Sequence, residues 1–278
     1  MRSVLITGAS SYVGRSLALA LLKNGFKVYP IVNNATSGIA GEIRCDLRDF
    51  SPKQLPKKVD FIVHLAAKTG SKIADGDQEA FDINVGGTLH LLDYACSAGI
   101  KNFLYFSTGS VYKAGNPLIE DRTPLQPRNF YALTKLMGEE AVRYYSKNFR
   151  FLILRLAYPY GPGEESGLVG GIASSIKDGR EVYENSGGRP FINPIHIDDL
   201  TSATLKGLDL QESMVINLGG PDIVKVGQVI RLLSKRFNKD PFLRTTSETV
   251  DDEVVDINRM RRYLVVPKIS FEEGIKQL

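Results

Sequence analysis

Five short apolar runs recur along the first 156 residues, and longer segments with a helical pattern separate them. The runs are SVLIT (3–7), KVYPIV (27–32), VDFIVHLA (59–66), NFLYFS (102–107) and RFLILRL (150–156). Runs that are apolar at nearly every position are typical of strands buried on both faces of a parallel sheet. Two of the helical segments end at Gly25 and Gly99, as helices commonly do. This alternation predicts an α/β fold with a Rossmann-type doubly wound parallel sheet.

The texture of the chain changes after about residue 157, where Gly- and Pro-rich loops replace the regular alternation. We therefore predict a Rossmann domain over residues 1–157, to which residues 193–217 return. A smaller C-terminal substrate-binding lobe is predicted to take up most of residues 158–278.

Composition limits the classes of partner. The net charge of +4 comes from scattered Lys and Arg, and the densest basic cluster, residues 258–263, is too short for a nucleic-acid-binding arm. The chain opens directly into its first apolar run, and no run of about 18 apolar residues occurs, so we expect no membrane span and a cytoplasmic protein. Cys45 and Cys96 are far apart and only three His are present, so no metal site is predicted.

The first predicted strand runs into TGASSYVG, in which Gly8 and Gly14 bracket a turn before a helix. Gly8 allows the chain to turn sharply, Gly14 allows the helix to pack closely on the strand, and free N–H groups at a helix start attract a pyrophosphate. Ser11 stands where the usual fingerprint has its middle glycine, so we expect a more constrained approach to the phosphates. The motif predicts a dinucleotide site.

The segment NFYALTK places Tyr131 four residues before Lys135, on one face of a predicted helix. Removing hydride from an alcohol carbon requires a base that takes the hydroxyl proton. A free phenol, with a pKa near 10, is a poor base at pH 7. We therefore expect Lys135 and a nicotinamide cation to lower the pKa of Tyr131.

Taken together, these motifs resemble the extended short-chain dehydrogenase/reductase family, which includes nucleotide-sugar epimerases, dehydratases and ketoreductases. The segments that carry the resemblance follow one order along nearly the whole chain: TGASSYVG, CDLRD (45–49), VDFIVHLAA (59–67), NVGGT (84–88), FSTGSVY (106–112), PRNFYALTK (127–135), LRLAYPYGP (154–162), IHIDDL (195–200) and INLGG (216–220). Each segment is weak alone, and the ordered series is specific.

The resemblance implies roles for individual residues. The catalytic set is expected to be Thr108, Tyr131 and Lys135, with Ser107 as the neighbouring alternative to Thr108. The expected cofactor contacts are Gly8, Ser10, Ser11, Tyr12, Val13, Gly14, Asn33, Asp46, Leu47, Leu65, Ala66, Ala67, Asn84, Tyr131, Lys135 and Tyr158. The expected substrate contacts are Lys68, Thr108, Ser110, Tyr158 and Arg189. Asn84 is expected either to brace the active-site helix or to cap the helix that follows it.

The cofactor is expected to be NAD or NADP, with a preference for NAD if the enzyme is an epimerase. The second strand ends at Val32, followed by Asn33 and Asn34, so no carboxylate there repels a 2′-phosphate and no adjacent Arg clearly attracts one. Asn33 is able to hydrogen-bond either form of the ribose. Asp46 is expected at the adenine, where it fits both cofactors.

The residues after the catalytic hydroxyl narrow the reaction. Dehydratases of the family carry an Asp-Glu pair there, and this chain has Gly109 and Ser110. The leading hypothesis is a nucleotide-sugar C4 epimerase or 4-ketoreductase that works as a homodimer through helices near 85–99 and 130–147. Two departures from the family pattern, Tyr158 for an Asn and Arg189 seven rather than four residues before His196, motivate an alternative: an NADPH-dependent reductase of a non-sugar carbonyl. A non-catalytic dinucleotide sensor is a third reading, but it predicts a broken catalytic set.

Overall fold

The computed structural model describes residues 1–70, 73–248 and 250–278, and the chain divides into two compact units. The first unit comprises residues 1–111, 125–155 and 204–216, and the second comprises residues 112–124, 156–203 and 217–278. The passage between them at residues 155 and 156 is close to the predicted domain end at 157. Residues 112–124, which were predicted to lie in the Rossmann domain, belong to the second unit.

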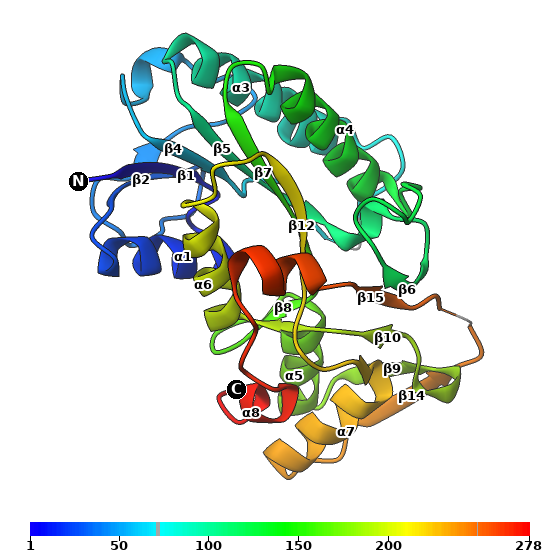
Figure 1. Cartoon of the computed structure of the whole chain (residues 1–278). Coiled ribbons are helices and arrows are strands. Elements are labelled where there is room, and N and C mark those ends of the chain that lie inside the picture. The colour runs from blue at the N-terminus through cyan, green and yellow to red at the C-terminus, as the bar shows by residue number, and fades with distance from the viewer. Residues whose placement is uncertain (71–72, 249) are drawn as a thin grey trace. The chain divides into compact units, whose positions relative to one another are not determined.

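Seven strands of the described chain form one sheet in the order β12-β7-β5-β4-β1-β2-β3 (Figure 1). Their bounds are β1 (Ser3–Thr7), β2 (Lys27–Val32), β3 (Ile43–Arg44), β4 (Phe61–His64), β5 (Asn102–Thr108), β7 (Arg150–Leu156) and β12 (Met214–Leu218). The pairs of β1 with β2 and β4, of β2 with β3 and of β4 with β5 are parallel. The predicted doubly wound parallel sheet is confirmed.

Helices cover both faces of this sheet. The helices are α1 (Tyr12–Lys23), α2 (Gln78–Phe81), α3 (Gly87–Ser97), α4 (Phe130–Tyr145) and α6 (Ile197–Gly207), with a π-helical turn at Asp82–Gly86 and 3₁₀ turns at Pro52–Gln54 and Gly109–Val111. Helices α3 and α4 lie on one face and α1 lies on the other (Figure 1). Helices α1 and α3 end two residues before the glycines that predicted their ends. No helix in the described part of the chain is long and apolar enough to span a membrane.

The core of the first unit forms between the sheet and α3 and α4. Five of its fully buried side chains come from four strands and from α3: Leu5, Ile62, Phe103 and Ile153 from the strands, and Leu91 from the helix. Removing this much apolar surface from water is the main force that holds the strands in place. The strand ends, and the side chains on them, are therefore held on a rigid scaffold.

The second unit is built from short strands and three helices of the described chain. Its elements are β6 (Gly115–Leu118), β8 (Pro159–Tyr160), α5 (Leu168–Asp178), β9 (Glu181–Asn185), β10 (Phe191–Ile192), β11 (Ile195–His196), β13 (Val224–Lys225), α7 (Val226–Phe237), β14 (Phe242–Thr246), β15 (Glu253–Val255) and α8 (Phe271–Ile275), with a 3₁₀ turn at Ser186–Gly188 and a π-helical turn at Met260–Leu264. Helices α5 and α7 pack through Val169, Ile176, Val229 and Leu233 around Tyr160.

Candidate active site

The carboxyl ends of β1, β2, β4 and β5 lie along one edge of the parallel sheet, and most of the predicted cofactor residues follow these ends. Gly8 follows β1, Asn33 follows β2, Leu65 follows β4, and Thr108 ends β5. The chain order reverses between β1 and β4, which is where ligands bind in open α/β sheets. The sheet therefore brings together residues that are as far as 100 positions apart in the sequence.

The turn after β1 has the geometry that its glycines predicted. Gly8 has φ +70°, and a Cβ there would lie 2.8 Å from the backbone nitrogen of Ala66. A Cβ on Gly14 would lie 2.1 Å from the carbonyl oxygen of Gly8. Both positions thus exclude a side chain, so that the start of α1 packs closely on the end of β1 and Gly8 packs closely on Ala66 after β4. This narrow glycine cradle at the start of α1 fits a dinucleotide pyrophosphate.

Ser11 has a structural use that the sequence did not predict. It is the N-cap of α1 and has ordinary extended backbone angles, so a glycine is not needed at this position. Its hydroxyl donates to the carbonyl oxygen of Gly8 at 2.8 Å and accepts from the backbone N–H of Gly14 at 3.1 Å. Through these two hydrogen bonds, Ser11 holds the turn closed.

The loop after β2 is contacted by an arginine of β3 that sequence reasoning missed. Strand pairing sets Arg44 of β3 opposite Val32, and its guanidinium donates to the carbonyl oxygens of Asn33 and Asn34 at 3.0 and 3.2 Å. The Asp46 carboxylate pairs with Arg48 at 2.6 Å, and this hydrogen bond is the main reason that the pKa of Asp46 is lowered. No Arg is adjacent to the end of β2 in the sequence, and Arg44 reaches it only through the β2–β3 register, which is a long-range property.

Tyr131 and Lys135 lie in the first two turns of α4, where Asn129 caps the helix by accepting the backbone N–H of Ala132 at 2.8 Å. Lys135 is 2% exposed, and its ammonium nitrogen lies 4.1 Å from the centroid of the Tyr105 ring. Burial lowers the pKa of Lys135 to about 7, and the charge of Glu139 opposes that shift. The ammonium is thus held in a dry, partly aromatic site.

The pKa of Tyr131 departs from its expected direction. Burial raises it to about 12, because a phenolate loses its hydration inside the protein. In the protein without a cofactor, the desolvation of the phenolate dominates, and the expected lowering of this pKa by Lys135 together with a nicotinamide cation stays a prediction. A second positive charge is needed to bring the phenol into working range.

Thr108 and Ser107 are neighbours on β5, and the structure separates them by their partners. Ser107 is buried and donates to a carboxylate oxygen of Glu139 at 2.5 Å. Thr108 is half-buried, and its hydroxyl oxygen accepts the backbone N–H of Ser110 at 3.2 Å. Only the Thr108 hydroxyl retains a proton to donate to a ligand, which supports the choice of Thr108 over Ser107.

Asn84 lies in the π-helical turn before α3 and is not the cap of a helix. Its side chain accepts the backbone N–H of Lys68 at 2.7 Å and donates to the Thr134 hydroxyl at 2.9 Å. The Thr134 hydroxyl in turn donates to the carbonyl oxygen of Tyr131 at 2.7 Å. Of the two expected roles, the bracing of the active-site helix is the one that this geometry supports.

A second polar chain continues from Asn84 toward the sheet. The carbonyl oxygen of Asn84 accepts the Thr88 hydroxyl, which lies 2.9 Å from Nε2 of the fully buried His64. The Nδ1 atom of His64 lies 2.7 Å from the Thr7 hydroxyl at the end of β1. Burial lowers the pKa of His64, so the ring is neutral at pH 7. These bonds join β1, β4 and α4 beneath the predicted site.

The predicted substrate contacts have other partners. Lys68 forms ion pairs with Asp77 at 2.9 Å and Glu79 at 2.7 Å, and these contacts raise the pKa of its ammonium. In the second unit, Arg189 pairs with Asp252. Their roles as substrate contacts stay predictions.

Tyr158, also in the second unit, has φ +42°, which is uncommon for an aromatic residue, and its hydroxyl donates to the buried Glu253 at 2.9 Å. No sequence pattern predicted this backbone conformation.

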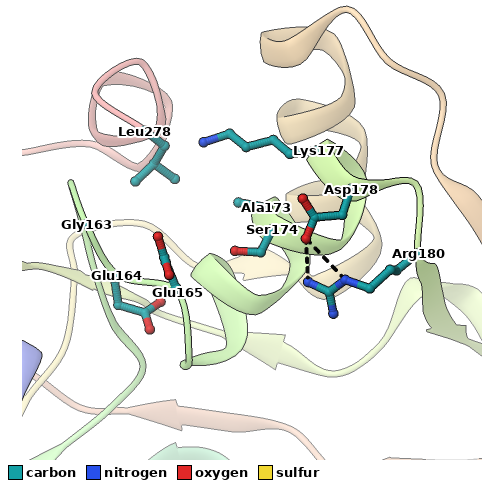
Figure 2. Close-up of a pocket in the computed structure, with 9 residues that line it drawn as sticks. All are labelled: Gly163, Glu164, Glu165, Ala173, Ser174, Lys177, Asp178, Arg180 and Leu278. Atoms are coloured by element: carbon teal, nitrogen blue, oxygen red, sulfur yellow. Dashed lines mark hydrogen bonds and ion pairs between the residues drawn. The ribbon is translucent and has the colours of Figure 1, made fainter.

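The second unit contains an open cleft of about 400 Å³ (Figure 2). None of the predicted site residues lines this cleft. Charges of both signs surround it, and Arg180 pairs with Asp178 at 3.0 Å across its rim. Glu164 is held by the backbone N–H groups of Ser166, Gly167 and Gly170 near the start of α5, so its carboxylate has a structural use.

These features define a dinucleotide-binding α/β protein with a hydroxyl, a phenol and a buried ammonium at the edge of its parallel sheet. The chain matches the family model described as the NAD dependent epimerase/dehydratase family over residues 4–219. The chain therefore belongs to that family, and its resemblance to the extended short-chain dehydrogenase/reductases is confirmed.

Relatives agree with this membership, and a solved structure shares the fold. The chain is 24% identical to a putative UDP-glucose 4-epimerase of Methanocaldococcus jannaschii, over 99% of this chain and 96% of the relative. It is 26% identical to the UDP-glucuronate 4-epimerase of Thermodesulfobacterium geofontis, over 98% and 94%. The UDP-glucuronic acid 4-epimerase of Bacillus cereus, solved with UDP-glucuronic acid and NAD, superposes with a TM-score of 0.89 at 23% identity, over 99% and 97%.

Proposed function

We propose that this protein is an NAD-dependent 4-epimerase of a UDP-sugar. The observation that carries the proposal is the arrangement at the sheet edge: a half-buried Thr108 hydroxyl ends β5, and Tyr131 and Lys135 occupy one face of α4. Family membership and the activities named for the relatives support the same conclusion.

Each residue of this set has a chemical task. The Thr108 hydroxyl donates to the reacting sugar oxygen and orients it toward the phenol. Tyr131 takes the hydroxyl proton and later returns it, and Lys135 stabilises the phenolate by its charge. Bound NAD supplies the site that accepts and returns the hydride. The positive charge of its nicotinamide ring offsets the desolvation that raises the pKa of Tyr131 to about 12.

Epimerisation fits better than dehydration because Gly109 and Ser110, which follow Thr108, carry no carboxylate to eliminate water. In an epimerase the hydride returns to the opposite face of the same carbon, so the cofactor is not exchanged during turnover. Solved neighbours that contain NAD support this cofactor.

A specific observation favours one second candidate, an NADPH-dependent ketoreductase. Arg44 lies at the carbonyl oxygens of Asn33 and Asn34 and has no carboxylate partner in the described residues. A guanidinium in this place is suited to a 2′-phosphate. The binding constants for NAD and NADP decide between the two candidates.

We propose a homodimer that forms through α3 and α4, and exposed apolar side chains on these helices support it. Leu89 is 37% exposed, Leu133 41% and Met137 38%. Large apolar side chains at one surface commonly mark an interface. A cytoplasmic location stays a prediction.

The test begins with the purified protein. Nucleotide released by denaturation is identified, and UDP-glucose, UDP-galactose and the corresponding uronic acids are then screened for interconversion without added cofactor. Retained NAD with interconversion supports the epimerase. Consumption of NADPH on a ketone without sugar interconversion refutes it.

Tyr131→Phe tests the role of the phenol. We expect turnover to fall by at least about 10³-fold, on the scale of lost general acid–base catalysis, with the dissociation constant of NAD changed by less than about threefold. Unchanged turnover in this variant contradicts the assignment.

A further inference from the structure

A buried carboxylate lies one helical turn beyond Lys135. Glu139 of α4 has no exposed surface, and its two oxygens accept Nε of Arg155 at 2.9 Å and Nη2 of Arg155 at 2.6 Å. The Ser107 hydroxyl donates to the same carboxylate at 2.5 Å. Bidentate pairs of this kind are short, directional and strong. Arg143 adds a longer contact at 3.4 Å from the partly exposed side of the helix.

The pair joins the elements that carry the proposed chemistry. Ser107 directly precedes Thr108 on β5, Glu139 follows Lys135 on α4, and Arg155 lies near the end of β7. A catalytic hydroxyl and a catalytic phenol must keep their relative position to within about 0.5 Å, and a buried, bidentate ion pair is able to impose that.

Glu139 interacts with both Lys135 and Arg155. Glu139 is the anion nearest to Lys135 along the helix, and yet no carboxylate lies within 4.0 Å of its ammonium in the described residues. Arg155 engages both oxygens of Glu139, so the carboxylate faces the guanidinium while its negative charge still acts on the ammonium. Without Arg155, the free carboxylate would draw the ammonium along the helix toward itself.

We propose that the buried Glu139–Arg155 pair is a positioning element for Lys135, in which Glu139 keeps the ammonium protonated and Arg155 prevents a direct Lys135–Glu139 ion pair. The inference rests on the proposed role of Lys135 beside Tyr131. It assigns a role to two residues that touch neither cofactor nor substrate.

Several other groups surround the ammonium, and each is accounted for. The groups that interact with Lys135 are Glu139 of α4, Tyr105 of β5 and His64 of β4. The neighbouring elements also carry Tyr131 and Arg143 on α4 and Arg155 on β7, and both arginines pair with Glu139. His64 is neutral at pH 7 because burial lowers its pKa, and the charge of Lys135 lowers it further. The two phenols have raised pKa values and are also neutral. Glu139 is therefore the one anion in this set.

The proposal predicts an order of Lys135 pKa values in four proteins. Glu139→Gln removes the anion and leaves the Arg155 charge, so the pKa of Lys135 falls by roughly one to two units. Arg155→Met leaves the anion unbalanced, so the pKa rises by a similar amount. The double variant lies between the wild type and Glu139→Gln, because the charge of Glu139 acts directly on Lys135 and has the larger effect.

The measurement is a ¹³C NMR titration of protein labelled at the lysine ε-carbon, with no substrate or cofactor added. The Lys135 resonance is the one that disappears in Lys135→Met. The expected order is Glu139→Gln, double variant, wild type, Arg155→Met, from the lowest pKa to the highest. Equal values, or shifts of the same sign in the two single variants, overturn the proposal, because a purely structural pair has no reason to act with opposite signs.

A single variant that leaves one buried charge alone is at risk of not folding. The double variant Glu139→Gln/Arg155→Met removes both charges of the pair, so it tests the proposal even if neither single variant folds. A Lys135 pKa below that of the wild type supports the proposal, and an equal or higher pKa overturns it. If the wild type interconverts no UDP-sugar, the proposed function fails, and the order of pKa values still tests the pair. If sugars are interconverted, the alkaline limb of kcat/KM must move with the same order, and Glu139→Gln must regain activity at lower pH.

Discussion

Lys135→Met is expected to make the folded protein more stable while it removes activity. The ammonium is 2% exposed, and burial lowers its pKa from 10.5 to about 7. A difference of about 3.5 units corresponds to roughly 5 kcal/mol of cost for keeping the charge inside the fold. Methionine has a similar length and no charge, but it loses the cation–π contact with Tyr105, worth up to about 2 kcal/mol when desolvated. The net gain in unfolding free energy at pH 7 is therefore roughly 2 to 4 kcal/mol.

The pH dependence of the unfolding free energy is a second test of the sign of this stability change. The folded state has the lower pKa for Lys135, so between about pH 7 and 10.5 the unfolded state binds more protons and wild-type stability rises with pH. Lys135→Met lacks this contribution. The stability difference between variant and wild type is therefore expected to shrink by roughly 2 kcal/mol between pH 7 and 9. Tyr131, with a raised pKa of about 12, contributes in the opposite sense only above about pH 10.

Urea unfolding followed by far-UV circular dichroism at pH 6, 7, 8 and 9 measures both effects. Lys23→Met, at an exposed position in the last turn of α1, is the matched control and is expected to change stability by less than about 0.5 kcal/mol. A Lys135→Met protein that is less stable than the wild type at pH 7, or a stability difference that does not change with pH, refutes the reasoning.

Three further predictions follow from individual contacts. Gly138→Ala places a Cβ 2.1 Å from the buried Tyr105 hydroxyl, so we expect a loss of about 1 to 3 kcal/mol, visible as a lower Tm, and an unchanged Tm contradicts this close contact. Leu133→Glu on α4 is expected to convert the proposed dimer to a monomer in sedimentation velocity, whereas Leu22→Glu on α1 is expected to leave the dimer intact. The same sedimenting mass for both variants argues against the α3–α4 interface. Arg44→Ala is expected to weaken NADP binding at least about fivefold in calorimetry and NAD binding less than twofold, and equal losses exclude a 2′-phosphate contact.

Much of the site was predictable because its signals are local. The glycine spacing around the first turn depends on backbone geometry within seven residues. Gly8 has the positive φ of the predicted sharp turn, and Gly14 has the predicted close approach to the end of β1. The choice of Thr108 over Ser107 came from counting along one strand. The hydrogen bond from Ser107 to the buried Glu139 carboxylate supports this choice. The same holds for Tyr131 and Lys135, whose spacing of four places them on one helix face.

The residues that sequence reasoning missed depend on distant partners. Arg44 reaches the end of β2 only through the pairing of two strands, and Glu139 meets Arg155 across 16 positions. The ion pairs of Lys68 with Asp77 and Glu79 were likewise not predicted. A list of residue types in order does not contain these pairings, because they are settled by how the elements pack.

The sequence by itself determined the order of strands and helices, the turn at the first glycines and the helical face shared by Tyr131 and Lys135, since each depends on covalent geometry and on the repeat of a helix or strand. Only the tertiary structure decided the electrostatics of that face. Burial raises the pKa of Tyr131 and lowers that of Lys135, against the effect expected from two neighbouring groups in water. The physical reason is that the cost of desolvating a charge depends on the packing of the whole unit around it, and spacing along the chain does not encode that cost.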